Sequence, residues 1–481
     1  LIKGETGDWE VVIGLEVHAQ VVSNAKLFSG AATTFGAEPN AQVSLVDAAM
    51  PGMLPVINAK CIEQTVRTGL GLNARITLTS VFDRKNYFYP DLPKGYQITQ
   101  FDRPLATAGV VDFDGPEGEG SVRIRRIHME EDAGKSLHDR VPGSTAVDLN
   151  RAGTPLVEVV TEPDLRTPAD VRAFLGTLKR TLEYIDVSDC NMEEGSLRAD
   201  ANVSVRRRGS ETLGTKTEIK NVNSFSGIER ALDIEIARQI DVLEQGGTIE
   251  QESLLWDDHR GEVRSMRSKE ESHDYRYFPE PDLPPLSVSA AEIEAARRAL
   301  PELPRARKAR LKADYSLPAY DAEVLTQSAA TADYFEGVVG AGANTKTASN
   351  WVMGALQALI NERGDDARDV PVRPESLARL IALVQDGTVS DSAAKKVLGF
   401  MADGGGEAME IIEAKGLLQV RDDGRLAEWV EAVVAESPDE VARYRSGETR
   451  VLGFLVGQVM RRSQGQADPR RVNELLVERL S

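Results

Sequence analysis

A change of pattern near residue 286 constrains the fold more than any other feature of this sequence. Up to about Val288 the chain alternates Val and Ile with polar residues between Gly, Pro and Asn, as in "WEVVIGLEVHAQVV", which is typical of strands. After the proline-rich "FPEPDLPPL" (278–286), Ala, Glu, Arg and Leu recur at helical spacing. The sequence therefore predicts an α+β protein with a large antiparallel-sheet domain over residues 1–290, followed by helical domains.

Two helices are predicted within the strand-rich part. One spans about Pro168–Tyr184 and is opened by "TPAD", and the other spans about Ser226–Gln245. In the helical part, "MADGGGEAME" (401–410) contains three consecutive glycines, which predict a hinge. We therefore expect an all-helical domain over 291–405 and a small helical tail domain over 406–481.

Length, cysteine content and charge limit the class of protein. A chain of 481 residues is long enough for roughly three domains. It has no long apolar run and no signal-peptide layout, so a cytoplasmic protein with no membrane association is expected. Cys61 and Cys190 alone cannot build a disulfide framework or a cysteine zinc site.

The net charge of −19 argues against a surface that binds nucleic acid everywhere. Between Arg443 and Arg471, however, seven arginines stand against two acids. This stretch is expected either to hold phosphates or to form a solvated helical face.

Three predicted strands each have one face of mixed acid and base, because residues two apart in a strand share a face. These residues are Glu16 and His18; Arg198, Asp200, Asn202 and Ser204; and Lys216, Glu218 and Lys220. If the strands share a sheet, oxygen ligands for a hard cation such as Mg²⁺ lie beside cations that bind phosphate. Taken singly, each face is more typical of a strand that meets water than of a site.

The stretch "HMEEDAGKS" (128–136) raises three alternatives. A phosphate loop of the form GxxxxGK[ST] requires a glycine where Met129 stands, and its acids would repel phosphate. A metal site fits better, with Glu130, Glu131 and Asp132 at the end of a strand and Lys135 beside them. A charged hairpin end is the third alternative.

The sequence contains no signature of covalent hydrolysis, neither GxSxG nor HExxH. Of its five histidines, we expect His128, His259 and His273 to be structural or exposed, and His138 stays ambiguous.

Several longer strings resemble one known family over essentially the whole chain. They include "VIGLEVHAQV", "FDRKNYFYPDLPKGYQITQ", "RIHMEEDAGKS", "DLNRAGTPLVEVVTEPD", "EEGSLRADANVSV", "TKTEIKNVNSF" and "GFLVGQVMRRSQGQADP". The chain is similar to the B subunit of bacterial aspartyl/glutamyl-tRNA amidotransferases. The resemblance implies a cradle domain, a helical domain and a tail domain.

The resemblance also implies a ligase that uses ATP and Mg²⁺, with Mn²⁺ as a substitute. It phosphorylates the side-chain carboxylate of glutamate or aspartate misacylated on tRNA, and ammonia then displaces phosphate. The implied partners are an amidase (A) subunit that supplies ammonia, a small C subunit and the misacylated tRNA. Whether glutamate, aspartate or both are acceptors is left open.

The resemblance and the shared strand faces together give the expected site. Metal ligands are expected at Glu16, His18, Glu131, Asp200 and Glu218, with Glu131 the strongest choice, and Glu130 and Lys135 complete the catalytic set. ATP phosphates or the tRNA 3′ end are expected at Lys85, Ser136, Asn150, Arg151, Arg198, Asn202, Lys216 and Lys220. The tRNA is also expected to contact the tail at Arg461, Arg462, Arg470 and Arg471.

One departure from the family pattern concerns zinc. Some relatives carry four cysteines after the GLEVH motif, but "LFSGAATTFGAEPNAQVSLVDAAMPG" has none, so no zinc is expected. Two alternatives to the catalytic role are a non-catalytic tRNA-binding scaffold and a free-standing carboxylate ligase for small amino acids. The arginines of the tail count against the second.

Overall fold

The computed structural model of the chain describes residues 1–258, 260–265, 275–364, 367–420, 422–463 and 465–480, and all their side chains except those of Asp139 and Asn221. The chain divides into two compact units, Leu1–Leu303 and Pro304–Ser481. The first unit is rich in strands and the second is helical, which confirms the predicted α+β class. None of the helices in the described ranges is both long and apolar enough to cross a bilayer.

The first unit is built on one ten-stranded sheet with the strand order β15-β14-β13-β12-β2-β11-β8-β7-β3, and β1 pairs with β2. Its pairs are antiparallel except β13 with β14. Its strands are β1 (Ile2–Lys3), β2 (Asp8–Gln20), β3 (Arg75–Ile76), β7 (Ala106–Gly115), β8 (Gly118–Glu131), β11 (Pro155–Thr161), β12 (Leu197–Arg207), β13 (Thr217–Val222), β14 (Ser253–Asp257) and β15 (Glu262–Ser265).

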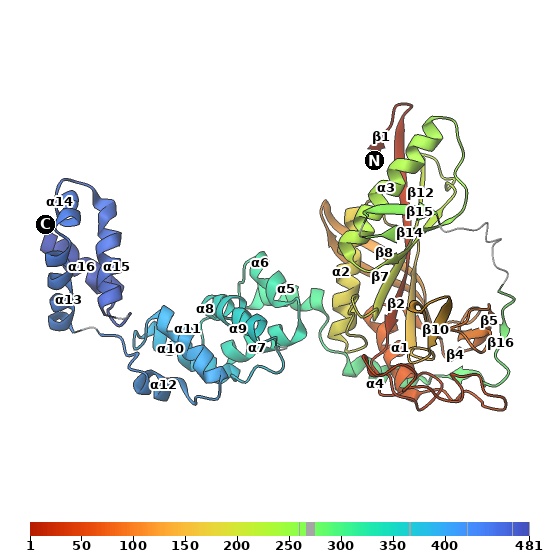
Figure 1. Cartoon of the computed structure of the whole chain (residues 1–481), viewed down its shortest axis with the longest axis horizontal. Coiled ribbons are helices and arrows are strands. Elements are labelled where there is room, and N and C mark those ends of the chain that lie inside the picture. Colours follow the sequence, from red (N-terminus) through yellow and green to blue (C-terminus); the bar gives the residue numbers. More distant parts are fainter. Residues whose placement is uncertain (259, 266–274, 365–366, 421, 464, 481) are drawn as a thin grey trace. The chain divides into compact units, whose positions relative to one another are not determined.

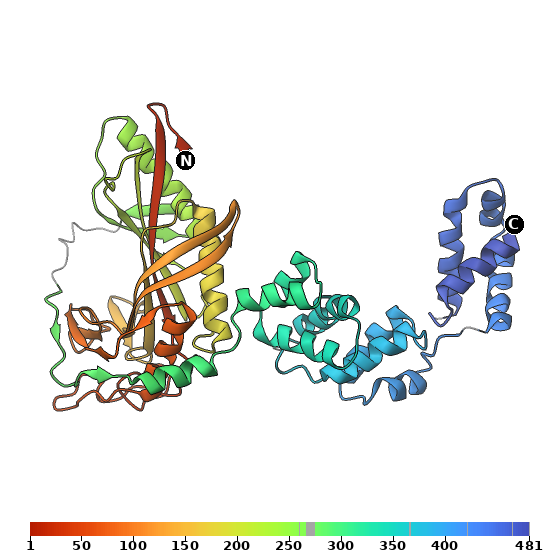
Figure 2. The same ribbon diagram turned by 180° about the vertical axis from the view of Figure 1, so that it is seen from behind.

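Helices cover one face of this sheet and leave the other face for the site. The helices of this unit are α1 (Ala59–Gly71), α2 (Pro168–Tyr184), α3 (Phe225–Glu244) and α4 (Ala290–Ala299). Both views show α2 and α3 alongside the same sheet (Figure 1; Figure 2). Ile13, Leu15 and Val17 of β2 pack in one apolar cluster with residues of α2 and α3. The other set of β2 residues, which includes Glu16 and His18, therefore points away from the helices.

The two predicted helices of this unit are confirmed. Helix α2 has the predicted bounds, and Thr167 caps it by accepting a hydrogen bond from the Asp170 amide at 3.0 Å. Helix α3 begins and ends within one residue of the predicted range.

Smaller sheets surround the open face. They are β9 (Lys135–Val141) with β10 (Ser144–Asp148); β5 (Asp83–Asn86) with β6 (Tyr96–Thr99) and β16 (Phe278–Pro279); and β4 (Thr79–Ser80) with β17 (Leu286–Ser287). The β5–β6 hairpin is tied to β8, because the Ile98 amide donates to the Glu131 carboxylate at 2.9 Å. The hairpin thereby forms a wall beside the polar face of the main sheet.

The second unit contains helices around two apolar clusters. The helices are α5 (Pro304–Asp314), α6 (Ala319–Leu325), α7 (Ala329–Gly340), α8 (Thr345–Trp351), a π-helical turn (Val352–Leu356), α9 (Gln357–Arg363), α10 (Pro374–Gln385), α11 (Asp391–Ala402), α12 (Ala408–Ala414), α13 (Asp423–Glu436), α14 (Pro438–Arg445), a 3₁₀ turn (Thr449–Val451), α15 (Leu452–Arg462) and α16 (Pro469–Leu480). One cluster includes Leu311 to Ile412, and the other includes Leu426 to Leu480.

The predicted domain boundaries differ from the packing by several residues. Helix α4 belongs to the first unit, since its Ile293 and Ala296 pack against an apolar cluster there, so the unit extends beyond residue 290. Helix α12 follows the three glycines, yet its Ile411 and Ile412 belong to the cluster that precedes them. The division into three domains stays a prediction.

Candidate active site

The polar face of the main sheet lines a pocket of about 1100 Å³. The sheet register brings its residues together from strands that are distant in sequence. His18 of β2 lies opposite Glu158 of β11, which lies opposite His128 of β8. On the other side of β2, Glu16 pairs with Asp200 and His18 pairs with Arg198 of β12.

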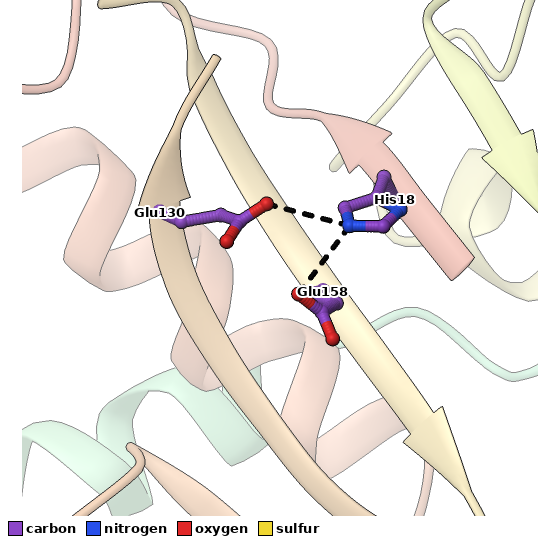
Figure 3. Close-up of side chains that lie close together, drawn as sticks. All are labelled: His18, Glu130 and Glu158. Carbon is purple, nitrogen blue, oxygen red and sulfur yellow. Dashed lines mark ion pairs between the residues drawn. The ribbon is translucent and has the colours of Figure 1, made fainter. Parts of the chain in front are cut away.

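Two imidazoles and two carboxylates meet at the centre of the pocket. His18 Nε2 lies 3.4 Å from a Glu130 oxygen and 3.3 Å from a Glu158 oxygen. Figure 3 shows these three side chains pointing toward one another from three strands. His128 Nε2 lies 3.3 Å from the same Glu158 oxygen, and its Nδ1 is buried without a hydrogen-bond partner among the described residues.

Burial and charge act against each other in this group. Burial would lower the pKa of His18, but hydrogen bonds with Glu130 and Glu158 outweigh it and raise the pKa well above the ordinary value. Burial and repulsion from Glu158 would raise the pKa of Glu130, yet hydrogen bonds with His128 and His18 lower it. Burial would likewise raise the pKa of Glu158, but attraction to His128 and hydrogen bonds with His128 and His18 lower it. Both carboxylates are therefore ionised and face positive charge, and a bound cation would displace the His18 proton.

Three further carboxylates lie beside this cluster, and two of them contact one ammonium group. Lys220 Nζ lies 3.0 Å from Glu218 Oε1 and 3.4 Å from Asp200 Oδ2. Glu16 lies opposite Asp200 in the sheet, and burial together with repulsion from Glu158 and Glu218 raises its pKa. Burial is also the largest cause that raises the pKa of Asp200.

Cations lie along the pocket between the two acidic groups and the hairpin wall. Arg198 donates to Asp132 at 2.9 Å, and Lys85 Nζ lies 4.7 Å from the Tyr275 ring centre. Arg151 donates to the carbonyls of Ala133 and Gly134 at 2.8 and 2.7 Å and so holds the bend after β8. Lys85, Arg151 and Arg198 all line the pocket, as does Lys220.

Glu131 does not join the predicted metal ligands. Residues 128 and 130 of β8 point into the pocket, so by strand alternation residues 129 and 131 point to the other face. The Glu131 carboxylate instead forms a buried ion pair with Lys94 and accepts the Ile98 amide at 2.9 Å. The structure brings Glu130, the neighbouring acid, to His18 instead.

The "GKS" residues lie outside the main pocket. Lys135 and Ser136 begin β9 and pair with Asp148 and Val147 of β10, so a strand stands where a phosphate loop would open a helix. A Cβ on Gly134 would lie 2.8 Å from the Asp148 carbonyl, which explains the glycine without phosphate.

Asn150 and Ser136, which were predicted to bind phosphate, also lie away from the main pocket. Asn150 and Lys135 line a second pocket of about 360 Å³, which shares Arg151 with the main one. The side-chain amide of Asn150 also donates to the Glu38 carbonyl at 2.7 Å. Ser136 donates to Asp91 at 3.0 Å.

Asn202 and Lys216 lie at the border of the acidic group. Asn202 donates to Glu16 at 3.3 Å and lies opposite Glu218 in the sheet, and Lys216 donates to the Asn202 side chain at 2.8 Å. Both residues therefore lie beside Glu16, as the shared strand faces predicted.

The tail arginines fall into two classes. Arg462 is paired with Glu436 at 2.9 Å, and Arg471 is paired with Asp423 at 2.7 Å. Arg461 and Arg470 are exposed, and their side chains have no hydrogen bond or ion pair within the described part of the tail. Of these four arginines, Arg461 and Arg470 therefore carry the positive charge that no carboxylate of the described tail compensates.

Sequence reasoning placed neither His128 nor Glu158 in the site. His128 was expected to be structural or exposed, and it is buried, with 3% exposed, and lines the pocket; His259 and His273 lie outside the described residues. Glu158 was not singled out. Its signal is a lone carboxylate in "PLVEVVT", a strand buried throughout, where an acid requires a partner.

Comparisons with known proteins give one consistent result. Residues 11–294 match the family model described as the GatB/GatE catalytic domain, and residues 333–480 match the one described as the GatB domain. The chain is 52% identical over its full length to the B subunit of the aspartyl/glutamyl-tRNA(Asn/Gln) amidotransferase of Paramagnetospirillum magneticum, covering 99% of that protein. It is 54% identical to the corresponding subunit of Methylobacterium nodulans, again over its full length and 98% of the relative.

Proposed function

Since the chain belongs to the GatB family, the B subunits of aspartyl/glutamyl-tRNA(Asn/Gln) amidotransferases, we propose that its sheet pocket carries out the ATP-dependent step of that reaction. The protein is a ligase subunit in protein biosynthesis, and as a subunit it acts in a complex. The observation that carries the assignment of the pocket is the convergence of His18, Glu130 and Glu158 beside the cations that line it.

The central cluster fits a divalent cation. His18, Glu130 and Glu158 each offer a ligand atom, and these atoms lie within 4.8 Å of one another. Mg²⁺ takes a few carboxylate ligands and completes its shell with water and substrate phosphates. We assign His18, Glu130 and Glu158 as the residues that would hold it, in place of the set that included Glu131. A bound Mg²⁺ supplies charge neutralisation on the phosphate oxygens.

A second group of ligands is available at Glu16, Asp200 and Glu218. These carboxylates border the same pocket, and at least two are held within 3.4 Å of a positive group. Both ligand groups belong to one continuous face of the sheet. The geometry therefore suits a nucleotide that spans two cations, an arrangement that phosphoryl transfer commonly uses.

The chain's own cations suit the phosphates and the acceptor carboxylate. Lys85 and Arg198 approach the acidic cluster from two sides, and both line the pocket. Attraction to Glu130 is among the causes that raise the pKa of Lys85, although burial opposes it. Both groups therefore stay charged at neutral pH and can position anions for transfer.

The proposed reaction balances without a protein nucleophile. An oxygen of the side-chain carboxylate on the tRNA attacks the γ-phosphorus of ATP, and the bond to ADP breaks. Ammonia then attacks the activated carbon, loses a proton and expels phosphate, which leaves the amide. We propose that an amidase subunit supplies the ammonia, that a small third subunit completes the complex, and that the tail contacts the tRNA.

The fate of the carboxylate oxygen tests this proposal. Misacylated tRNA whose side-chain carboxylate carries ¹⁸O is incubated with the assembled enzyme, ATP, Mg²⁺ and ammonia. We expect one ¹⁸O atom in inorganic phosphate for each amide formed, and we expect its loss in Glu130→Gln. Label in AMP would indicate an adenylate instead. Unchanged transfer in Glu130→Gln would make this chain a scaffold whose partner carries the chemistry.

A further inference from the structure

Lys220 occupies an unusual place for a phosphate-binding residue. Its ammonium group lies 3.0 Å from Glu218 and 3.4 Å from Asp200, and it points into the acidic group and not toward an open anion site. Glu16 adds a third carboxylate, since it lies opposite Asp200 in the sheet. Lys220 is thus the positive group that directly contacts two of these acids, and His18 adds positive charge near Glu16 and Asp200.

The three acids come from three neighbouring strands. Glu16 of β2 lies opposite Asp200 of β12, and Glu218 of β13 lies opposite Asn202, two residues along β12. Lys220 follows Glu218 at the spacing that keeps both side chains on one face of β13. The sheet register therefore brings the three acids together, and the flexible four-carbon stem of Lys220 allows its ammonium group to move among them or away from them.

A divalent cation and the ammonium group compete for the same oxygen atoms. A cation bound to Asp200 or Glu218 would lie about 2 to 2.5 Å from an oxygen that Lys220 already contacts. Two positive ions about 4 Å apart repel each other strongly in a partly buried site. Because 39% of the Lys220 side chain is exposed to the pocket, it has room to withdraw.

We propose that Lys220 is an internal counter-ion, which fills the site formed by Glu16, Asp200 and Glu218 until a divalent cation displaces its ammonium group into the pocket. This inference rests on the proposed function, because that function supplies the divalent cation. The lysine keeps the acids together before the cation binds. Once displaced, it adds a positive charge where the nucleotide phosphates are expected.

Metal binding by the full-length chain tests this role independently of activity. All variants are made in a chain that already carries Glu130→Gln, which weakens Mn²⁺ binding at the central site. Mn²⁺ titrations followed by electron paramagnetic resonance then report binding at Glu16, Asp200 and Glu218. Removing the competing charge with Lys220→Met is expected to tighten Mn²⁺ binding about tenfold. Lys220→Arg retains the charge and is expected to leave the affinity near that of the background.

Lys216→Met is the matched control. This lysine lies in the same region, but its ammonium donates to the neutral side chain of Asn202 at 2.8 Å. Its removal is expected to change Mn²⁺ affinity little. An equal gain in both variants would show a general charge effect and would reject the counter-ion role.

Thermal unfolding supplies a second readout. Without metal, Lys220→Met is expected to unfold at a lower temperature than its background, because three acids lose their counter-ion. Mn²⁺ is expected to raise this unfolding temperature back to that of the background. If Lys220→Met is already unfolded in EDTA, we expect it to refold when Mn²⁺ is added. Failure of Mn²⁺ to restore the fold, or no gain in affinity, would overturn the proposal.

A Glu218→Gln variant separates the two claims. If it binds Mn²⁺ as tightly as the background, these acids hold no divalent cation, and the second ligand group of the proposed function fails with the inference. If it binds weakly while Lys220→Met shows no gain, only the counter-ion role is rejected.

Discussion

Glu130 and Glu131 are neighbours in the chain, yet their carboxylates lie in different environments. Glu130 faces His18 in the pocket, whereas Glu131 faces Lys94 and the hairpin wall. A strand turns successive side chains to opposite faces, so one position determines whether an acid can serve the site. The two residues therefore form a matched pair for mutation.

Glu130→Gln is expected to lower amidation on the order of 100-fold and Mn²⁺ affinity about tenfold or more, because it removes a charged ligand. Amidation assays and Mn²⁺ titrations measure both effects. Glu131→Gln is expected to keep Mn²⁺ affinity but to lose about 3 kcal/mol of stability, since it breaks a buried ion pair. A larger loss of Mn²⁺ affinity in Glu131→Gln would contradict the assignment.

At the residue scale the sequence predicted part of the site. The alternation of "VVIGLEVHAQ" and "SLRADANVSV" placed Glu16, His18, Asp200 and Asn202 on one face, and the register agrees. The choice between Glu130 and Glu131 depends on where the bend after β8 begins, which three consecutive acids do not reveal. Glu158 was missed because a single acid in an apolar strand does not form a charged face.

At the scale of elements, Thr161 supports the strand that carries Glu16. The backbone pairing of β11 with β2 ends at Val160 opposite Glu16, and the next amide, that of Leu15, donates to the Thr161 hydroxyl at 2.9 Å in the core. Thr161→Val keeps the shape but leaves that amide unpaired. We expect it to cost about 2 kcal/mol of stability in denaturant unfolding. Thr161→Ser keeps the hydroxyl and is expected to cost less; equal losses would show that packing matters and the hydrogen bond does not.

In the helical unit, Glu336 of α7 joins α5. Arg307 and Arg310 donate to its carboxylate at 3.0 and 2.7 Å. Burial would raise the pKa of Glu336, but hydrogen bonds from Arg310 and Arg307 outweigh it and lower the pKa to about 2. A lowered pKa in the folded state stabilises the fold above the ordinary value of 4.5, and this stability is lost as the pH falls from 4.5 through about 2.

Glu336→Gln is therefore expected to lower the free energy of unfolding by about 2 kcal/mol at pH 7. The difference from the unmodified chain is expected to shrink as the pH falls from 4.5 toward 2. Denaturant unfolding at several pH values measures it. A difference that stays constant across this range would show that the carboxylate charge contributes nothing.

The elements themselves were largely predictable, but their assembly was not. Helix α2 has its cap and its apolar spacing within one segment, so local sequence specifies its bounds. The hairpin wall of β5, β6 and β16 joins segments far apart in the chain, as Arg84 pairs with Phe278. The sequence of either segment alone does not indicate that the two pair, and strands this short show little alternation of apolar and polar residues.

At the scale of the whole molecule, the net charge of −19 leaves only local patches for tRNA. Arg461→Gln with Arg470→Gln is expected to reduce the salt dependence of tRNA binding by about one unit of slope for each arginine, because both side chains lack an ion pair in the described tail. Filter-binding titrations at several salt concentrations measure the slope.

The control uses the arginines that are already paired. Arg462→Gln and Arg471→Gln release the carboxylates of Glu436 and Asp423 as they remove positive charge. We expect Arg461 and Arg470 to contact the tRNA phosphates, because their charge is not already compensated by a carboxylate within the described residues of the tail. A greater loss of slope in the paired variants would reverse that assignment.

The central claim is that three strands of one sheet bring His18, Glu130 and Glu158 together to hold a divalent cation. Anomalous diffraction from crystals of the enzyme soaked with Mn²⁺ and a non-hydrolysable ATP analogue tests it most directly. We predict a manganese peak bonded to His18 Nε2 and to both carboxylates, with the nucleotide phosphates in the same pocket. A peak at Glu131, or a nucleotide bound away from this face of the sheet, would contradict the account.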